Sequence, residues 1–60
     1  MRLAEIRNAK NLTPTQLAQK AGLSVTFIKL LESDKKSPTL RTLNKIAVAL
    51  DVPIVELLDK

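Results

Sequence analysis

PTQLAQKAGLSVTFIKLL, residues Pro14 to Leu31, is the stretch that decides the fold of this 60-residue chain. It holds Gly22, the only glycine in the sequence, between two segments with a helical spacing of apolar residues. A lone glycine here predicts a helix end in the left-handed conformation, and Ser24 predicts a new start, because its hydroxyl can cap the next helix. Two helices joined by so short a turn form a helix-turn-helix, which we place at about residues 14–33.

The residues before this stretch predict a first helix and a strong start for the second. Arg2 to Lys10 contains neither glycine nor proline, and Asn11 can end a helix in the left-handed conformation. Thr13 can cap the second helix, Pro14 suits its first position, and Gln16 can complete a capping box.

The residues after the stretch predict a loop and two further helices. Residues 33–39 contain the loop, and either Ser37 or Thr39 can cap the helix that follows. The apolar spacing predicts a fourth helix over Thr39 to Leu50 and, after the break at Pro53, a short fifth helix through Leu58. The apolar side of the fourth helix is formed by Leu40, Leu43, Ile46, Ala47 and Leu50, and that of the fifth by Ile54, Leu57 and Leu58.

Length and charge restrict the class of protein. Sixty residues suit one domain, residues 1–60, and without cysteine or histidine its stability must come from helix packing. The net charge of +4 is uneven: residues 19–46 carry six basic and two acidic side chains, whereas residues 47–60 are net negative. A polyanion is the expected partner, although lysines also simply solvate surfaces. No apolar run is long enough to span a membrane, and the absence of cysteine fits the cytoplasm, where a nucleic acid as the polyanion would make the protein nucleoid-associated.

The chain resembles the Cro/CI-type helix-turn-helix family, the lambda-repressor-like DNA-binding domains of phage and bacterial regulators. The matching residues of the motif are Leu17, Ala18, Gly22, Leu23, Ser24, Ile28 and Leu31. Outside the motif they are Arg7, Glu32, Lys35, Lys36, Pro38 and the segment LRTLNKIAVALDV. The resemblance covers nearly all of residues 3–58. It implies an all-α, five-helix fold that binds double-stranded DNA sequence-specifically, as a dimeric transcriptional repressor on a palindromic operator.

The resemblance also implies that the third helix, predicted over Val25 to Ser33, reads bases in the major groove. With Ile28 at the centre of its buried face, a helical wheel directs Thr26, Lys29 and Leu30 outward. The implied base-reading residues are Val25, Thr26, Lys29 and Leu30. Thr26 and Lys29 can hydrogen-bond to base edges, whereas Val25 and Leu30 can only pack on thymine methyl groups. Val25 is alternatively a core residue.

Phosphate contacts are expected from groups around this helix. Pro14 stands where the family often has a phosphate-binding glutamine, so anchoring at the start of the second helix must rest on its neighbours and their amides. The candidates are Thr15, Gln16, Phe27, Lys35 and Lys36. Phe27 is alternatively a packing residue.

Two further expectations come from the resemblance. Arg7 of the first helix matches an arginine that pairs with a glutamate of the third, here Glu32, and holds the recognition helix in place; the alternative is two unrelated surface charges.

A weak homodimer is expected through the fifth helix and the turn before it, although scattered surface apolar residues would need no explanation. The residues concerned are Val48, Pro53, Val55 and Leu58.

Two other functions compete with repression. The chain is alternatively an antitoxin or other protein-interaction module, with a cognate toxin as partner, or the DNA-tethering domain of a longer protein. Catalysis is not expected, because the sequence has no histidine, no cysteine and no phosphate-cradling glycine loop. For the same reason we expect neither a cofactor nor a bound metal.

Overall fold

The helices form in the predicted order. The computed structural model describes residues 1–58, and residues 59 and 60 of the predicted domain lie outside that range. In it, α1 (Leu3–Ala9), α2 (Pro14–Ala21), α3 (Val25–Glu32), α4 (Leu40–Leu50) and α5 (Ile54–Leu58) follow one another without a strand. Each boundary lies within one residue of its prediction, so the all-α, five-helix fold is confirmed.

Local signals in the sequence set the start and end of α2. The Thr13 Oγ1 accepts the Gln16 N–H at 3.1 Å, and the Gln16 Oε1 accepts the Thr13 N–H at 2.8 Å. These two bonds are the predicted capping box. At the other end, Gly22 has φ +70°, the left-handed conformation that a side chain disfavours.

The remaining turns use the same chemistry. Asn11 and Asp34 adopt φ angles of 59° and 60° after α1 and α3, respectively. Thr39, and not Ser37, caps α4, because its Oγ1 accepts the Thr42 N–H at 3.2 Å. The structure thus decides an alternative that the sequence left open.

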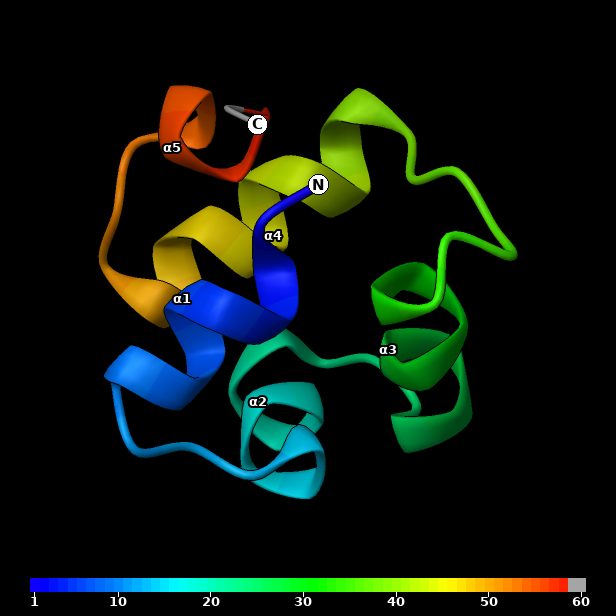
Figure 1. Cartoon of the computed structure of the whole chain (residues 1–60), viewed down its shortest axis with the longest axis horizontal. Coiled ribbons are helices and arrows are strands. Elements are labelled where there is room, and N and C mark those ends of the chain that lie inside the picture. Colours follow the sequence, from blue (N-terminus) through cyan, green and yellow to red (C-terminus); the bar gives the residue numbers. More distant parts are fainter. Residues whose placement is uncertain (59–60) are drawn as a thin grey trace.

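One hydrophobic core joins all five helices. Its fully buried large side chains are Leu3, Leu17, Ile28, Leu31, Ile46, Leu50 and Leu57, at least one from each helix. Burying a side chain of this size stabilises a fold by about 1.5–3 kcal/mol. The helix-turn-helix pair of α2 and α3 packs on α4 and α1, so that α3 lies at one side of the molecule (Figure 1).

Two residues on the predicted apolar sides of α4 and α5, Leu40 and Leu58, are exposed. Leu40 is 72% exposed, so its expected burial was wrong, whereas the 55% exposure of Leu58 agrees with its place among the expected dimer residues. Leu40 is the first residue of α4 and Leu58 the last of α5. At helix ends, a side chain can face the correct direction and still extend beyond the neighbouring helices.

The N-terminus packs beside the last helix. The Arg2 N–H donates to the Leu57 carbonyl at 3.1 Å, and the Arg2 guanidinium pairs with Glu5 at 2.9 Å. The hydrogen bond from Arg2, together with its positive charge, lowers the pKa of the exposed Glu5 carboxyl. Among residues 1–58, no helix is long and apolar enough to cross a membrane.

Candidate nucleic-acid interface

Helix α3 has one face buried in the core and a polar face exposed to solvent. Ile28 and Leu31 are completely buried, and the Ser24 Oγ accepts the Phe27 N–H at 3.0 Å, which caps the first turn. Thr26 and Lys29 are exposed on the opposite side. The helix therefore holds these two polar side chains outward on a backbone fixed at its start and along its length.

The two apolar base-reading candidates are less accessible. Val25 is half-buried and packs against the core. Leu30 is half-buried, although the helical wheel placed it outside. The chain after α3 closes on Leu30, whose carbonyl accepts the Lys35 N–H at 3.0 Å and the Ser33 hydroxyl at 3.2 Å. Because the loop folds back onto the end of α3, it covers part of the helix surface there, and Leu30 is less exposed than it would be on an isolated helix.

The start of α2 offers few free donors. Pro14 has no amide hydrogen, the Gln16 N–H is used in the capping box, and the Leu17 N–H donates to the Thr13 carbonyl at 3.0 Å. Thr15 is exposed, and its amide has no acceptor in the described part of the chain. The Gln16 side chain is exposed too, with its oxygen occupied and its NH₂ group available.

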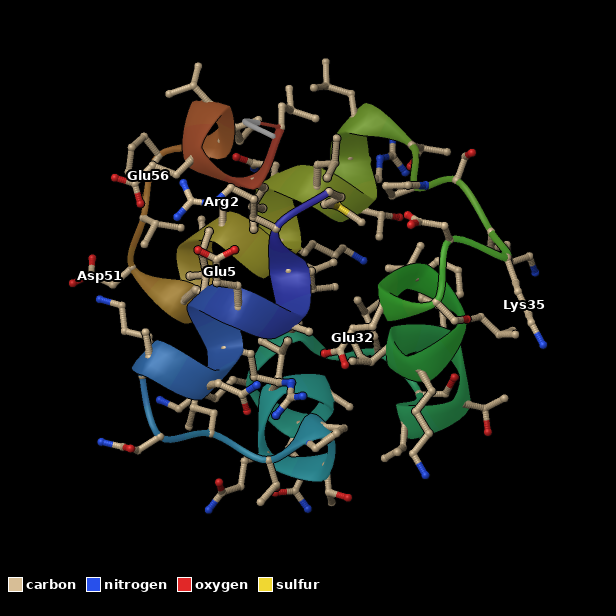
Figure 2. All side chains as sticks on the ribbon, viewed as in Figure 1. Arg2, Glu5, Glu32, Lys35, Asp51 and Glu56 are labelled. Atoms are coloured by element: carbon tan, nitrogen blue, oxygen red, sulfur yellow. The ribbon has the colours of Figure 1, made fainter. Side chains whose placement is uncertain are left out.

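The loop after α3 carries two exposed lysines in different settings. Lys35 extends outward from the loop into solvent (Figure 2). The Lys36 Nζ lies 5.7 Å from the centre of the Phe27 ring. Phe27 itself is half-buried and packs against the core.

The ion pair expected between α1 and α3 is present. The Arg7 Nε donates to Glu32 Oε2 at 2.6 Å and Nη2 donates to Oε1 at 3.1 Å. Figure 2 shows Glu32 pointing inward from α3. Arg7 Nη1 also donates to the Leu12 carbonyl at 2.7 Å and to Asn8 Oδ1 at 3.2 Å. One guanidinium thus joins α1, the chain leading into α2, and the end of α3.

The expected dimer residues are all exposed, and two of them share a hollow. Val48 is 72% exposed, Val55 69% and Leu58 55%, and Pro53 is exposed as well. Val48 and Pro53 both line a shallow hollow of about 350 Å³ at the turn between α4 and α5. Val55 and Leu58 lie three residues apart on α5.

Three acidic side chains lie together away from α3. A hollow of about 480 Å³ lies between α1 and the turn from α4 to α5, and it is lined by Glu5, Asp51 and Glu56 together with Arg2 and Lys10. Figure 2 shows the three carboxylates on the side opposite Lys35. Around α3, the exposed Lys29, Lys35 and Lys36 outnumber the exposed Asp34, so this is the more positive side, the one that a polyanion would meet.

Sequence reasoning missed two contacts near the interface. The bond from Arg7 to the Leu12 carbonyl involves a backbone acceptor, which no side-chain pattern reports. The approach of Lys36 to Phe27 joins a helix to a loop, where no helical period relates the positions. Only the composition could have indicated the contact between Lys36 and Phe27, because Phe27 is the only aromatic residue of the sequence and lies in a lysine-rich region.

Comparison with known proteins agrees with this architecture. The family model described as Helix-turn-helix matches residues 3–57. The chain is 46% identical over 56 residues to the cryptic phage CTXphi transcriptional repressor RstR of Vibrio cholerae, covering 93% of this chain and 50% of that protein. It is 40% identical over 53 residues to the immunity repressor protein of Bacillus phage phi105, covering 88% of this chain and 37% of that protein. The chain thus spans half or less of the length of these two relatives.

A solved structure gives the same result for the fold. The N-terminal DNA-binding domain of SinR from Bacillus subtilis superposes with a TM-score of 0.89 at 30% identity, covering 98% of this chain and 87% of that one. Because the family model reaches from the first residue of α1 into α5 and the structural match spans nearly the whole chain, this protein belongs to the Cro/CI-type helix-turn-helix family of DNA-binding domains.

Proposed function

We propose that this protein binds double-stranded DNA sequence-specifically through α3 and represses transcription. The observation that carries the proposal is the exposed pair Thr26 and Lys29 on the outer face of a capped helix whose inner face is buried. A helix is about 10–12 Å wide and the major groove about 12 Å, so the outer face fits against base edges. Thr26 can donate or accept there, and Lys29 can donate to guanine.

Phosphate contacts on both sides of α3 would fix its register in the groove. Lys35 and Lys36 follow the helix, and the free amide of Thr15 with the Gln16 NH₂ group precedes it. Such contacts position a protein without reading sequence. Val25 and Leu30, both half-buried, have a smaller part in base reading than Thr26 and Lys29 under this proposal.

The proposal includes a weak homodimer on a two-fold symmetric operator. It is supported by the exposure of Val48, Val55 and Leu58, which together with Pro53 leave apolar surface at α4 and α5 uncovered. Two copies related by a two-fold axis would cover this surface and place their α3 helices about 34 Å apart, one helical turn of DNA.

The test is fluorescence anisotropy with a labelled duplex of random sequence, titrated at several salt concentrations between about 50 and 200 mM. We expect affinity to fall steeply with salt, and Lys35→Met to weaken binding to every duplex alike. Lys10→Met is the control, since it removes the same charge from the hollow beside Asp51. If the two variants bound equally well, the positive side around α3 would not be the DNA-binding side.

A further inference from the structure

The segment from Lys36 to Pro38 has few restraints of its own. Before it, the Asp34 and Lys35 amides donate to the carbonyls of Leu31 and Leu30 at 3.2 and 3.0 Å. After it, Thr39 is fixed by the cap of α4. Among residues 1–58, no hydrogen bond is found for residues 36–38. What this segment does have is the approach of the Lys36 ammonium to the Phe27 ring.

We propose that Phe27 is a positioning residue that holds the Lys36 ammonium for contact with a DNA phosphate. This inference rests on the proposed DNA-binding function. The distance of 5.7 Å from Nζ to the ring centre is within the range of cation–π attraction. Because Phe27 is half-buried against the core, its ring is a fixed platform with part of its surface open.

The lysine remains able to bind an anion while it rests on the ring. Lys36 is exposed, and an ammonium has three N–H donors, whereas attraction to a ring face needs only its charge. A free lysine loses rotamer freedom when it contacts a phosphate, and a lysine already held loses less. We therefore expect the ring to hold Lys36 where the phosphate contact forms, without itself touching DNA, and the contact to be lost when the ring is removed.

Lys35 provides a comparison within the same loop. Its backbone amide is bonded to Leu30, and its side chain extends into solvent (Figure 2). Loss of the Phe27 ring should therefore change the contribution of Lys36 and leave that of Lys35 intact.

The experiment measures the slope of log affinity against log salt for a random-sequence duplex. One lost phosphate contact reduces this slope by about 0.9. We expect Phe27→Leu to reduce it by that amount, as Lys36→Met does, and Phe27→Leu/Lys36→Met to reduce it no further. Phe27→Leu/Lys35→Met should reduce it by about 1.8, and Phe27→Tyr should preserve it. Affinity at a fixed salt concentration should fall about two- to fivefold for Phe27→Leu.

An unchanged slope in folded Phe27→Leu, or a second full decrease on adding Lys36→Met, would overturn the inference. A readout that needs no substitution covers the case of an unfolded variant. In the proton NMR spectrum of the unmodified protein, the ε-methylene of Lys36 should be shifted upfield of that of Lys35 by the ring current, and equal shifts would overturn the proposal.

The outcomes also separate this inference from the function on which it rests. If the unmodified protein had no salt-dependent affinity for duplex DNA, the proposed function and this inference would both be wrong. If it bound, and Lys35→Met reduced the slope while Phe27→Leu did not, only the role of Phe27 would be wrong.

Discussion

The Arg7 guanidinium donates two hydrogen bonds, of 2.6 and 3.1 Å, to the Glu32 carboxylate across the contact between α1 and α3. Both side chains are largely shielded, with exposures of 10% and 14%. A bidentate ion pair that is shielded from solvent in this way fixes the relative position of the two helices. Removing either partner leaves the other as an uncompensated charge inside the protein.

Glu32→Ala should therefore unfold much of the population at 25 °C. Such losses cost about 3–5 kcal/mol, and a core of this size without disulfide or metal seldom supplies more than about 3–5 kcal/mol in total. Arg7→Ala should be at least as damaging, because it also leaves the Leu12 carbonyl without its donor. The double mutant should lose less stability than the sum of the two single mutants.

The measurement is thermal unfolding followed by circular dichroism. Glu5→Ala is the matched control, because it removes a carboxylate from the exposed pair with Arg2 and should melt close to the parent. A Glu32→Ala melt that also lay within a few degrees of the parent would mean that the α1–α3 pair is no stronger than a surface contact.

Thr13→Ala should destabilise the domain by about 1 kcal/mol, because it removes the side-chain acceptor of the α2 capping box. For a domain of this size, that corresponds to a decrease in Tm of about 4–8 °C. Thr15→Ala, two residues further on and exposed, should melt like the parent. Equal Tm values for the two variants would show that the capping box does not stabilise α2.

Asp34→Gly should be more stable than Asp34→Asn, by about 0.5–1 kcal/mol. Asp34 has φ 60°, which glycine adopts without the cost that a side chain imposes. Both variants remove the same charge beside the loop lysines, so they should bind duplex DNA equally and more tightly than the parent. Because both variants have the same charge, the difference between their chemical denaturation midpoints reports the cost of the left-handed backbone at residue 34. Equal midpoints would contradict the claim that a side chain at this position is strained.

Val55→Lys should leave the monomer folded and abolish cooperative binding to two half-sites about 34 Å apart. Leu40→Lys is the matched control, since Leu40 is 72% exposed against 69% for Val55 but lies outside the proposed dimer surface. Occupancy curves on single and paired half-sites provide the measurement. If the unmodified protein bound both kinds of site with the same curve, or if both variants lost cooperativity alike, the proposed surface would be wrong.

Local signals predicted the helix boundaries because local chemistry sets them. The capping box of Thr13 and Gln16 and the left-handed turn at Gly22 depend on residues that are adjacent in the chain, so the sequence contains the whole interaction. Leu40 was misplaced because a helical wheel gives the direction of a side chain but not what lies beside it. Whether another helix covers a terminal residue depends on the tertiary arrangement.

Some features of the candidate site could be predicted from the sequence, and others could not. The outward direction of Thr26 and Lys29 follows from helical geometry once the buried face of α3 is known. The partial burial of Leu30 depends on how the next loop closes, and the contact of Lys36 with Phe27 depends on the path of residues 33–36. Loop paths have no sequence period, so neither feature was accessible without the structure.

The claim that α3 reads base edges is tested most directly by affinities for a panel of duplexes in which each base pair of a selected half-site is changed in turn. The unmodified protein, Lys29→Ala and Thr26→Ala are compared, with Lys35→Ala as the phosphate control. We predict that Lys29→Ala and Thr26→Ala each lose discrimination at one or two positions by about 1–3 kcal/mol, while Lys35→Ala weakens binding to the whole panel equally. Folded Lys29→Ala and Thr26→Ala proteins with the same preference as the parent at every position would contradict the account.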